Sequence, residues 1–425
     1  MHVLPSLYYC NTWCMYGASF GAAFNGKNTR IVFCDNDGGE EADALFYAFL
    51  NITNPTPNPG VFATVEKRAC SSVDDLRQTV LEHASVLGKN TVVGGVYIPS
   101  GFTPNIKAFV SGTTAAISSK VTTIVDEGFN PSFMNRAVNP VYAASVARYN
   151  SIKTGSFFKA TPDAGIAAAA AAAPGTAARA SLLAPAQVNA IRLNTASPIG
   201  GLASTLGVIF LFVQAQVQLM MLHPMLMPLF GKVKFQHYIN IRRVTAYGMS
   251  TCFAFISAAL TAIFGTYNEY IDGKIWIYLF LSSWLIITTF GVTISFCQFT
   301  FGPLAPTAIG IFNALSIASA QFDAPWACLP DFFQLGRALA MPNGVELFRC
   351  VLFGSCYNVG ANVGILVASQ VFATLFLVFM AKNQFLAKVN GEKMQKLGHL
   401  VGASGFGGSP QGASNAGLGM AITSH

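Results

Sequence analysis

Residues 275–296 read IWIYLFLSSWLIITTFGVTISF, a run without a single charged side chain. As a helix rising about 1.5 Å per residue, this run is long enough to cross the roughly 30 Å of hydrocarbon in a bilayer. It therefore predicts a transmembrane helix. Four other uncharged stretches of similar length are also predicted to span the membrane: 202–222, 244–264, 303–322 and 363–381.

The charged residues divide the chain into a polar part and an apolar part. Only 10% of the 425 residues are charged, whereas soluble proteins carry about 25%. This low fraction excludes an ordinary soluble enzyme. Of the 43 charges, 26 lie between Lys27 and Arg192. The sequence thus predicts four segments: 1–24, 25–200 as a polar domain, 201–381 as a membrane domain, and a tail 382–425 that is disordered after residue 400.

Basic residues indicate which side of the membrane each segment faces, because cytoplasmic loops retain Lys and Arg. Two segments carry eight basic residues and are predicted to be cytoplasmic, namely the loop after the first span (Lys232, Lys234, Arg242, Arg243) and the tail (Lys382, Lys388, Lys393, Lys396). The alternation of the loops places the polar domain outside the cytoplasm, and the expected location is the plasma membrane. No Asp, Glu, Lys or Arg is expected at mid-depth in the membrane, which weakens a proton-driven mechanism.

The polar domain has the pattern of a small α/β or α+β domain. Strands are predicted at 29–34, 61–65 and 91–98, and helices at 40–50 and 73–87. Beyond Gly112 the pattern is mostly helical up to Tyr149.

The apolar segment 1–24 lacks the basic start of a signal peptide. We interpret it as a truncated first transmembrane helix, the alternatives being a signal anchor or an interfacial segment.

The segment 329–353 has apolar residues at helical spacing, but Pro330 and Pro342 interrupt it and charges punctuate it. It is predicted to form short amphipathic helices at the outer interface. With Arg349, these prolines mark a candidate outer gate.

Amide side chains occur within the predicted spans. Gln214 and Gln218 are four residues apart and so share one helix face. In hydrocarbon such amides either bond across helices or line a wet path. Together with Asn313 and Gln321 they form a candidate polar path.

Other residue patterns give few sites. Asn51-Ile52-Thr53 is a glycosylation sequon. No catalytic or metal-ligating constellation is recognisable, so neither an enzyme nor a cofactor is predicted. Five cysteines outside the cytoplasm could include a disulfide or remain buried thiols: Cys34, Cys70, Cys328, Cys350 and Cys356.

Several motifs near the C-terminus resemble those of a membrane family. They are LPDFFQLG at 329–336, MPN at 341–343 and NVGANVGIL at 358–366, in which Asn358, Asn362 and Gly364 belong to the signature. YGASF at 16–20 and RIVFCDNDGG at 30–39 extend the likeness towards the N-terminus. The chain resembles the fungal nitrosoguanidine-resistance proteins, a family of unknown function related to the bacterial YhgE/Pip proteins.

This resemblance implies six transmembrane helices, a large outer domain between the first two, and a membrane region similar to ABC-2 type permeases. It implies export of, or resistance to, toxic small molecules, or remodelling of lipid and membrane. Expected partners are membrane lipids, a small hydrophobic or toxic substrate, and a second copy of the chain or a separate ATPase docking on 232–243. Nucleic acid is not expected. The alternative is a receptor or scaffold that acts through its outer domain and does not transport.

Overall fold

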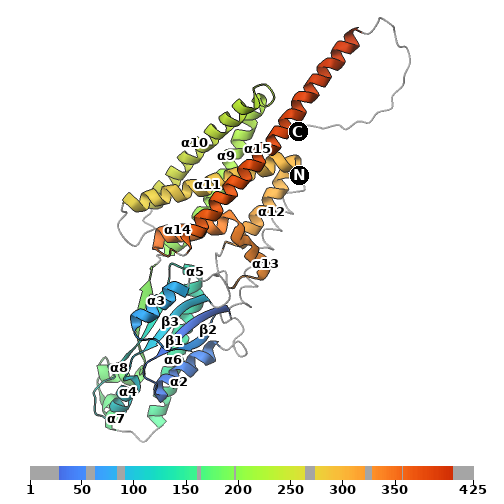
Figure 1. Cartoon of the computed structure of the whole chain (residues 1–425). Helices are drawn as coiled ribbons and strands as arrows, with labels where there is room; N and C mark the ends of the chain where they lie inside the picture. The colour runs from blue at the N-terminus through green and yellow to red at the C-terminus, as the bar shows by residue number, and fades with distance from the viewer. Residues whose placement is uncertain are drawn as a thin grey trace.

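The computed structural model describes residues 28–53, 63–83, 91–159, 164–195, 198–263, 273–320, 328–356 and 358–404. These residues form an elongated molecule with a sheet domain at one end and a helical bundle at the other (Figure 1). The predicted first transmembrane helix in 1–24, Gln321, and the tail after residue 404 lie outside the described residues.

A five-stranded mixed sheet organises the polar domain, in the order β2-β1-β3-β4-β5. β1 is parallel to both β2 and β3, β3 is antiparallel to β4, and β4 is parallel to β5. The strands are β1 Thr29–Asp35, β2 Thr64–Arg68, β3 Thr91–Ile98, β4 Lys120–Asp126 and β5 Gln187–Leu193. The expectation that the chain is mostly helical beyond Gly112 is wrong at β4, whose β-branched run Val121–Val125 favours extended backbone.

Helices cover both faces of this sheet. Successive strand residues point to opposite faces, so Ile31 and Phe33 of β1 pack in one core while Val32 and Cys34 pack in the other. The larger core lies under α2, α4 and α6, and the smaller one under α3. The domain's helices are α2 Glu40–Thr53, α3 Val73–His83, α4 Phe102–Val110, α5 Pro131–Phe133, α6 Asn139–Lys159, α7 Ala164–Ala171 and α8 Ala177–Leu183, with a π-helical turn Met134–Val138 before α6.

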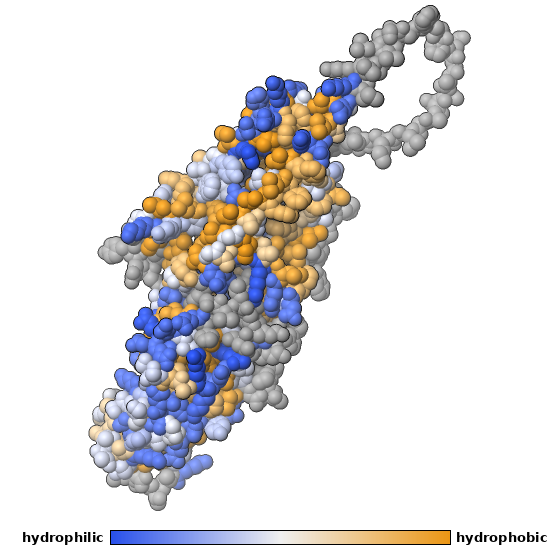
Figure 2. All heavy atoms as spheres, viewed as in Figure 1, coloured by the Kyte–Doolittle hydropathy of each residue, from blue (hydrophilic) through white to orange (hydrophobic). Residues whose placement is uncertain are grey.

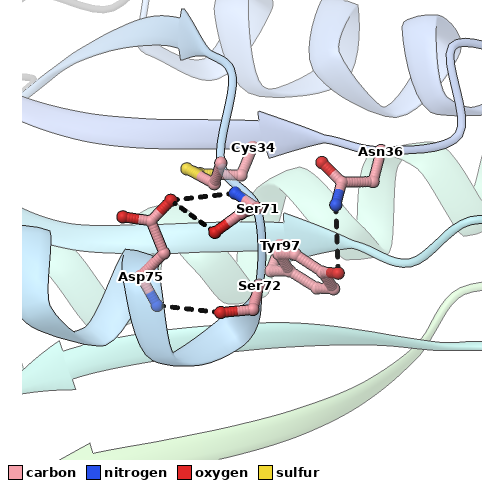
Figure 3. Close-up of a disulfide and its surroundings, with 7 residues drawn as sticks. Cys34, Asn36, Ser71, Ser72, Asp75 and Tyr97 are labelled. Atoms are coloured by element: carbon pink, nitrogen blue, oxygen red, sulfur yellow. Dashed lines mark hydrogen bonds between the residues drawn. A yellow bond between two sulfur atoms is a disulfide. The ribbon is translucent and has the colours of Figure 1, made fainter.

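Two disulfides lie in the part of the chain that is predicted to face away from the cytoplasm. Cys34 of β1 is bonded to Cys70, which precedes α3 (Figure 3). There the Asp75 carboxylate accepts hydrogen bonds from the Ser71 amide and hydroxyl, which fixes the start of α3. Cys350 is likewise bonded to Cys356. Four of the five cysteines predicted to lie outside the cytoplasm are therefore paired, and the fifth, Cys328, is a buried free thiol.

Within the residues that the structure describes, the bundle contains four helical segments long and apolar enough to cross a membrane: Ala203–Leu229, Phe235–Ile263, Gly273–Ala318 and Val359–Lys393. Their helices are α9 Pro198–Leu226 with the 3₁₀ turn Met227–Leu229, α10 Phe235–Ile263, α11 Gly273–Phe301 and α15 Val359–Ser404. Large apolar side chains point outward along them, and Figure 2 shows hydrophobic residues over the bundle and hydrophilic residues over the sheet domain. The chain is therefore described as a membrane protein.

The predicted count of five spans is not confirmed. The stretch expected to be the fourth, 303–322, contains α12 Ala305–Ala318, which follows α11 through the 3₁₀ turn Gly302–Leu304. Its 14 residues rise only about 21 Å, less than a bilayer core needs. In Figure 1, α12 runs back from this turn towards α13, so it forms a short hairpin arm with α11.

The segment predicted as interfacial helices divides into two parts: its first helices are largely exposed, whereas its last helix belongs to the bundle core. It forms α13 Asp331–Gln334, the 3₁₀ helix Leu335–Ala338 and α14 Ala340–Phe353. Pro342 lies in the first turn of α14 and does not break it, because the amides of a first turn have no helical partner. α14 buries 11 of its 14 residues and packs against α9, α11 and α15.

Candidate functional site

A large cavity lies where the sheet domain meets the bundle. It measures about 970 Å³, a size typical of small-molecule sites. Its walls are mostly apolar and come from α11 (275–285), α14 and the loop after it (347–356), and the start of α15 (359–363). The sheet domain adds polar side chains through Arg192, Asn194 and Thr195 at the end of β5. We refer to it as the junction cavity.

Hydrogen bonds around Asp126 connect the sheet domain to the helical bundle next to the junction cavity. Asp126 ends β4, and its carboxylate accepts from Asn194 Nδ2 at 3.1 Å and from Ser355 Oγ at 3.3 Å. Asn194 follows β5, whereas Ser355 follows α14 within the loop closed by the Cys350–Cys356 disulfide. The side chain therefore connects two strands of the domain to the bundle. Burial raises the pKa of Asp126 to about 6, whereas the hydrogen bonds that its carboxylate accepts act to lower the pKa.

Arg349 makes a second connection between α14 and the sheet domain. Only 2% of the residue is exposed, and Nη1 donates to the Phe129 carbonyl at 3.1 Å. Burial lowers the pKa of Arg349 to about 10, while the nearby charge of Glu346 acts in the opposite direction. Of the three candidate gate residues, Arg349 is thus placed at the junction, whereas Pro330 caps α13 and Pro342 lies in the bundle core.

The predicted polar path is only partly assembled. Gln218 bridges two helices, because Nε2 donates to the Ala246 carbonyl at 2.6 Å and Oε1 accepts from Ser250 Oγ at 3.2 Å. Gln214 lies one turn earlier on α9, with Oε1 buried and not hydrogen-bonded. Asn313 is on α12 and does not line the cavity that Gln218 lines.

Arg242, which the sequence predicts in a cytoplasmic loop, is a buried residue of α10. The helix begins at Phe235, nine residues before the predicted span, and Arg242 is 4% exposed. Nη2 donates to Ser295 Oγ of α11 at 3.3 Å, and the guanidinium lies 5.0 Å from the centre of the Phe299 ring. Arg242 lies in the first third of α10, so the expectation that mid-depth of the membrane lacks Asp, Glu, Lys and Arg stays a prediction.

A second cavity, of about 60 Å³, lies beside Arg242 among α9, α10, α11 and α15. Its polar lining comprises Gln218, Arg242, Arg243, Tyr247, Ser250, Thr288, Ser295 and Thr374. We refer to it as the arginine cavity.

Comparison with known proteins gives one result. Residues 2–375 match the model of a family described as a protein of unknown function, DUF3533. The chain belongs to this family. No curated protein and no solved structure matches the chain.

The DUF3533 match covers the sheet domain, the junction cavity, most of the residues that line the arginine cavity, and the part of α15 up to residue 375. The signature residues lie at the start of α15, where the Asn362 amide donates to the Asn358 carbonyl at 3.0 Å. Asn362 is buried and Gly364 exposed. Their neighbours Val359 and Val363 line the junction cavity, so this motif of the DUF3533 chain builds one cavity wall.

Asn51 of the sequon lies in the last turn of α2 and is exposed. The hydroxyl of Thr53 is turned inward and donates to the Phe49 carbonyl at 2.9 Å.

A Gln218→Leu variant is expected to lose about 1 kcal/mol of stability, because two hydrogen bonds between α9 and α10 disappear. The measurement is the thermal unfolding midpoint in detergent. Gln216→Leu, on the same helix, is the control and is expected to leave the midpoint unchanged. Equal midpoints for both variants would contradict the bridging role of Gln218.

Proposed function

We propose that this protein moves amphipathic molecules, either toxic small molecules or lipids, from the membrane towards the side on which the sheet domain lies. The observation that carries this proposal is the junction cavity, whose walls are apolar on the bundle side and polar on the domain side. An amphipathic molecule has the same two parts. It would place its apolar part against α11 and α15 and its polar part near Arg192 and Asn194.

The sheet domain is proposed to lie outside the cytoplasm, in a protein of the plasma membrane. Disulfides persist in oxidising compartments, and both disulfides lie in the domain or at the junction. The opposite end of the bundle is basic. There Lys388 Nζ donates to the Phe230 carbonyl at 2.8 Å, which brings the turn with Lys232 and Lys234 next to the second half of α15. This distribution agrees with the preference of Lys and Arg for the cytoplasm.

The resemblance to nitrosoguanidine-resistance proteins and ABC-2 type permeases supports the same proposal and suggests a separate energy source. An ATPase acting on the bundle would dock at the basic turn between α9 and α10, the part of the chain that carries Lys232 and Lys234.

The test blocks the junction cavity without changing the fold. Leu281 lines the cavity and its side chain is half exposed, so Leu281→Trp fills space at little cost to the core. In a strain that lacks the protein, wild type is expected to lower the accumulation of a fluorescent cationic drug. Leu281→Trp is expected to leave accumulation at the level of the empty vector.

Ile277 provides a matched control. It lies one turn earlier on α11, is 51% exposed against 50% for Leu281, and does not line the cavity. Ile277→Trp is expected to act as wild type. If wild type itself does not change accumulation, the export proposal fails for this class of drug. If both variants act as wild type, the cavity is not the path.

The alternative of a non-transporting receptor or scaffold makes a different prediction. It expects Leu281→Trp, Gln214→Leu and Gln218→Leu to retain resistance, while lesions in the sheet domain abolish it.

A further inference from the structure

We propose that the arginine cavity is a binding site for a compact anionic group, such as a phosphate or carboxylate headgroup. This site is separate from the junction cavity, and its test does not depend on transport.

The first support is the state of the Arg242 guanidinium. It lines the arginine cavity, is almost fully buried, and its Nη1 atom has no hydrogen-bond partner. A buried charge within a membrane bundle is costly unless another group compensates it. Among the residues that the structure describes, no carboxylate forms an ion pair with it.

The second support is the chemistry of the surrounding side chains. Ser295 Oγ accepts from Arg242 and keeps its own hydroxyl proton to donate, whereas the hydroxyls of Ser250 and Thr288 already donate to protein oxygens. Arg243 adds a second positive charge. None of the lining residues is acidic. Planar guanidinium groups bind carboxylates and phosphates through paired hydrogen bonds. The cavity has a volume of about 60 Å³, which is enough for a few waters or one compact group but too small for a drug-sized molecule.

The third support is how the guanidinium is held. Ser295 fixes Nη2 and the Phe299 ring lies against the cationic carbon, so the orientation is set by α11. Tyr238 also interacts with the guanidinium, yet Nη1 and the Tyr238 hydroxyl both lack a hydrogen-bond partner within the described residues, and both could meet a ligand. Lys232 and Lys234 lie at the same end of α10 and would attract anions towards this part of the bundle.

The test measures lipid binding to the full chain in a neutral detergent. Bound phosphatidic acid and phosphatidylcholine are counted by native mass spectrometry as each is added. Wild type is expected to prefer phosphatidic acid, and Arg242→Gln is expected to weaken that binding by about tenfold or more. Lys234→Gln removes the same charge from an exposed position nearby and is expected to change it by less than about twofold.

Two further arms complete the experiment. Arg242→Lys keeps the positive charge but loses the paired guanidinium donors, so it is expected to bind phosphatidic acid with intermediate affinity. It takes the place of Arg242→Gln in the comparison if that variant does not fold. Displacement of the lipid by millimolar inorganic phosphate would show that the phosphate group alone is recognised, whereas no displacement would assign the site to lipid. The proposal is overturned if wild type shows no preference for phosphatidic acid. It is also overturned if Arg242→Gln and Lys234→Gln weaken binding equally.

Discussion

An Arg349→Met variant is expected to unfold at markedly lower temperature than wild type, with a loss of about 3 kcal/mol in the free energy of unfolding. Met fills a similar volume but cannot donate a hydrogen bond to the Phe129 carbonyl. That hydrogen bond connects α14 to the segment that follows β4 of the sheet domain. The carbonyl then loses a buried charge-assisted hydrogen bond. Glu346 also loses the positive charge with which it interacts.

The consequence should be local as well as global. Because Arg349 connects α14 to the segment after β4, hydrogen exchange of residues 126–134 is expected to accelerate in the variant. Arg148→Met is the control, since Arg148 is an exposed residue of α6, and its effect is expected to stay within about 0.5 kcal/mol. Equal stability of the two variants would show that Arg349 does not hold the junction.

The elements with strong local signals could be predicted from the sequence. The uncharged runs locate α9, α11 and α15, and the strands at 29–34 and 91–98 agree with β1 and β3. The sequence pattern does not predict β5, because Gln187–Leu193 mixes polar and apolar residues and pairs as a strand with β4. The sequence pattern predicts a separate span at 303–322, because length and apolar composition do not reveal the turn at Gly302, whose φ is +49°.

The sites depend on contacts between distant segments, which local patterns do not show. Asp126 and Ser355 are 229 positions apart in the sequence, and neither belongs to a motif. The sequence predicts Arg242 in a loop because the uncharged run that marks the second span begins only at Val244, after Arg243. The spacing of Tyr238, Ile239 and Arg242 offered a signal, since residues three and four apart share a helix face and all three are buried.

The stability of the junction is expected to depend on pH through Asp126. Its pKa is about 6 in the folded protein against an ordinary value of 3.8, so between these values the folded state holds a proton that the unfolded state has lost. The contribution of Asp126 is therefore fully present below pH 3.8 and is lost as pH rises through 6. The shift corresponds to about 3 kcal/mol.

The measurement compares the unfolding midpoints of wild type and Asp126→Asn in detergent at several pH values. Wild type is expected to gain stability relative to the variant as pH falls from 7 to 4. The neighbouring charges, Glu127 paired with Arg192 at 3.4 Å and the Arg349 guanidinium, are present in both proteins, so their titration cancels in the difference. Asp75→Asn should show the opposite sign, because hydrogen bonds from Ser71 lower the pKa of Asp75. Wild type therefore loses stability relative to that variant in acid.

A difference between wild type and Asp126→Asn that does not vary with pH would mean that the carboxylate titrates alike in the folded and unfolded protein. The junction would then have to be hydrated around Asp126, in contradiction to the buried hydrogen bonds with Asn194 and Ser355.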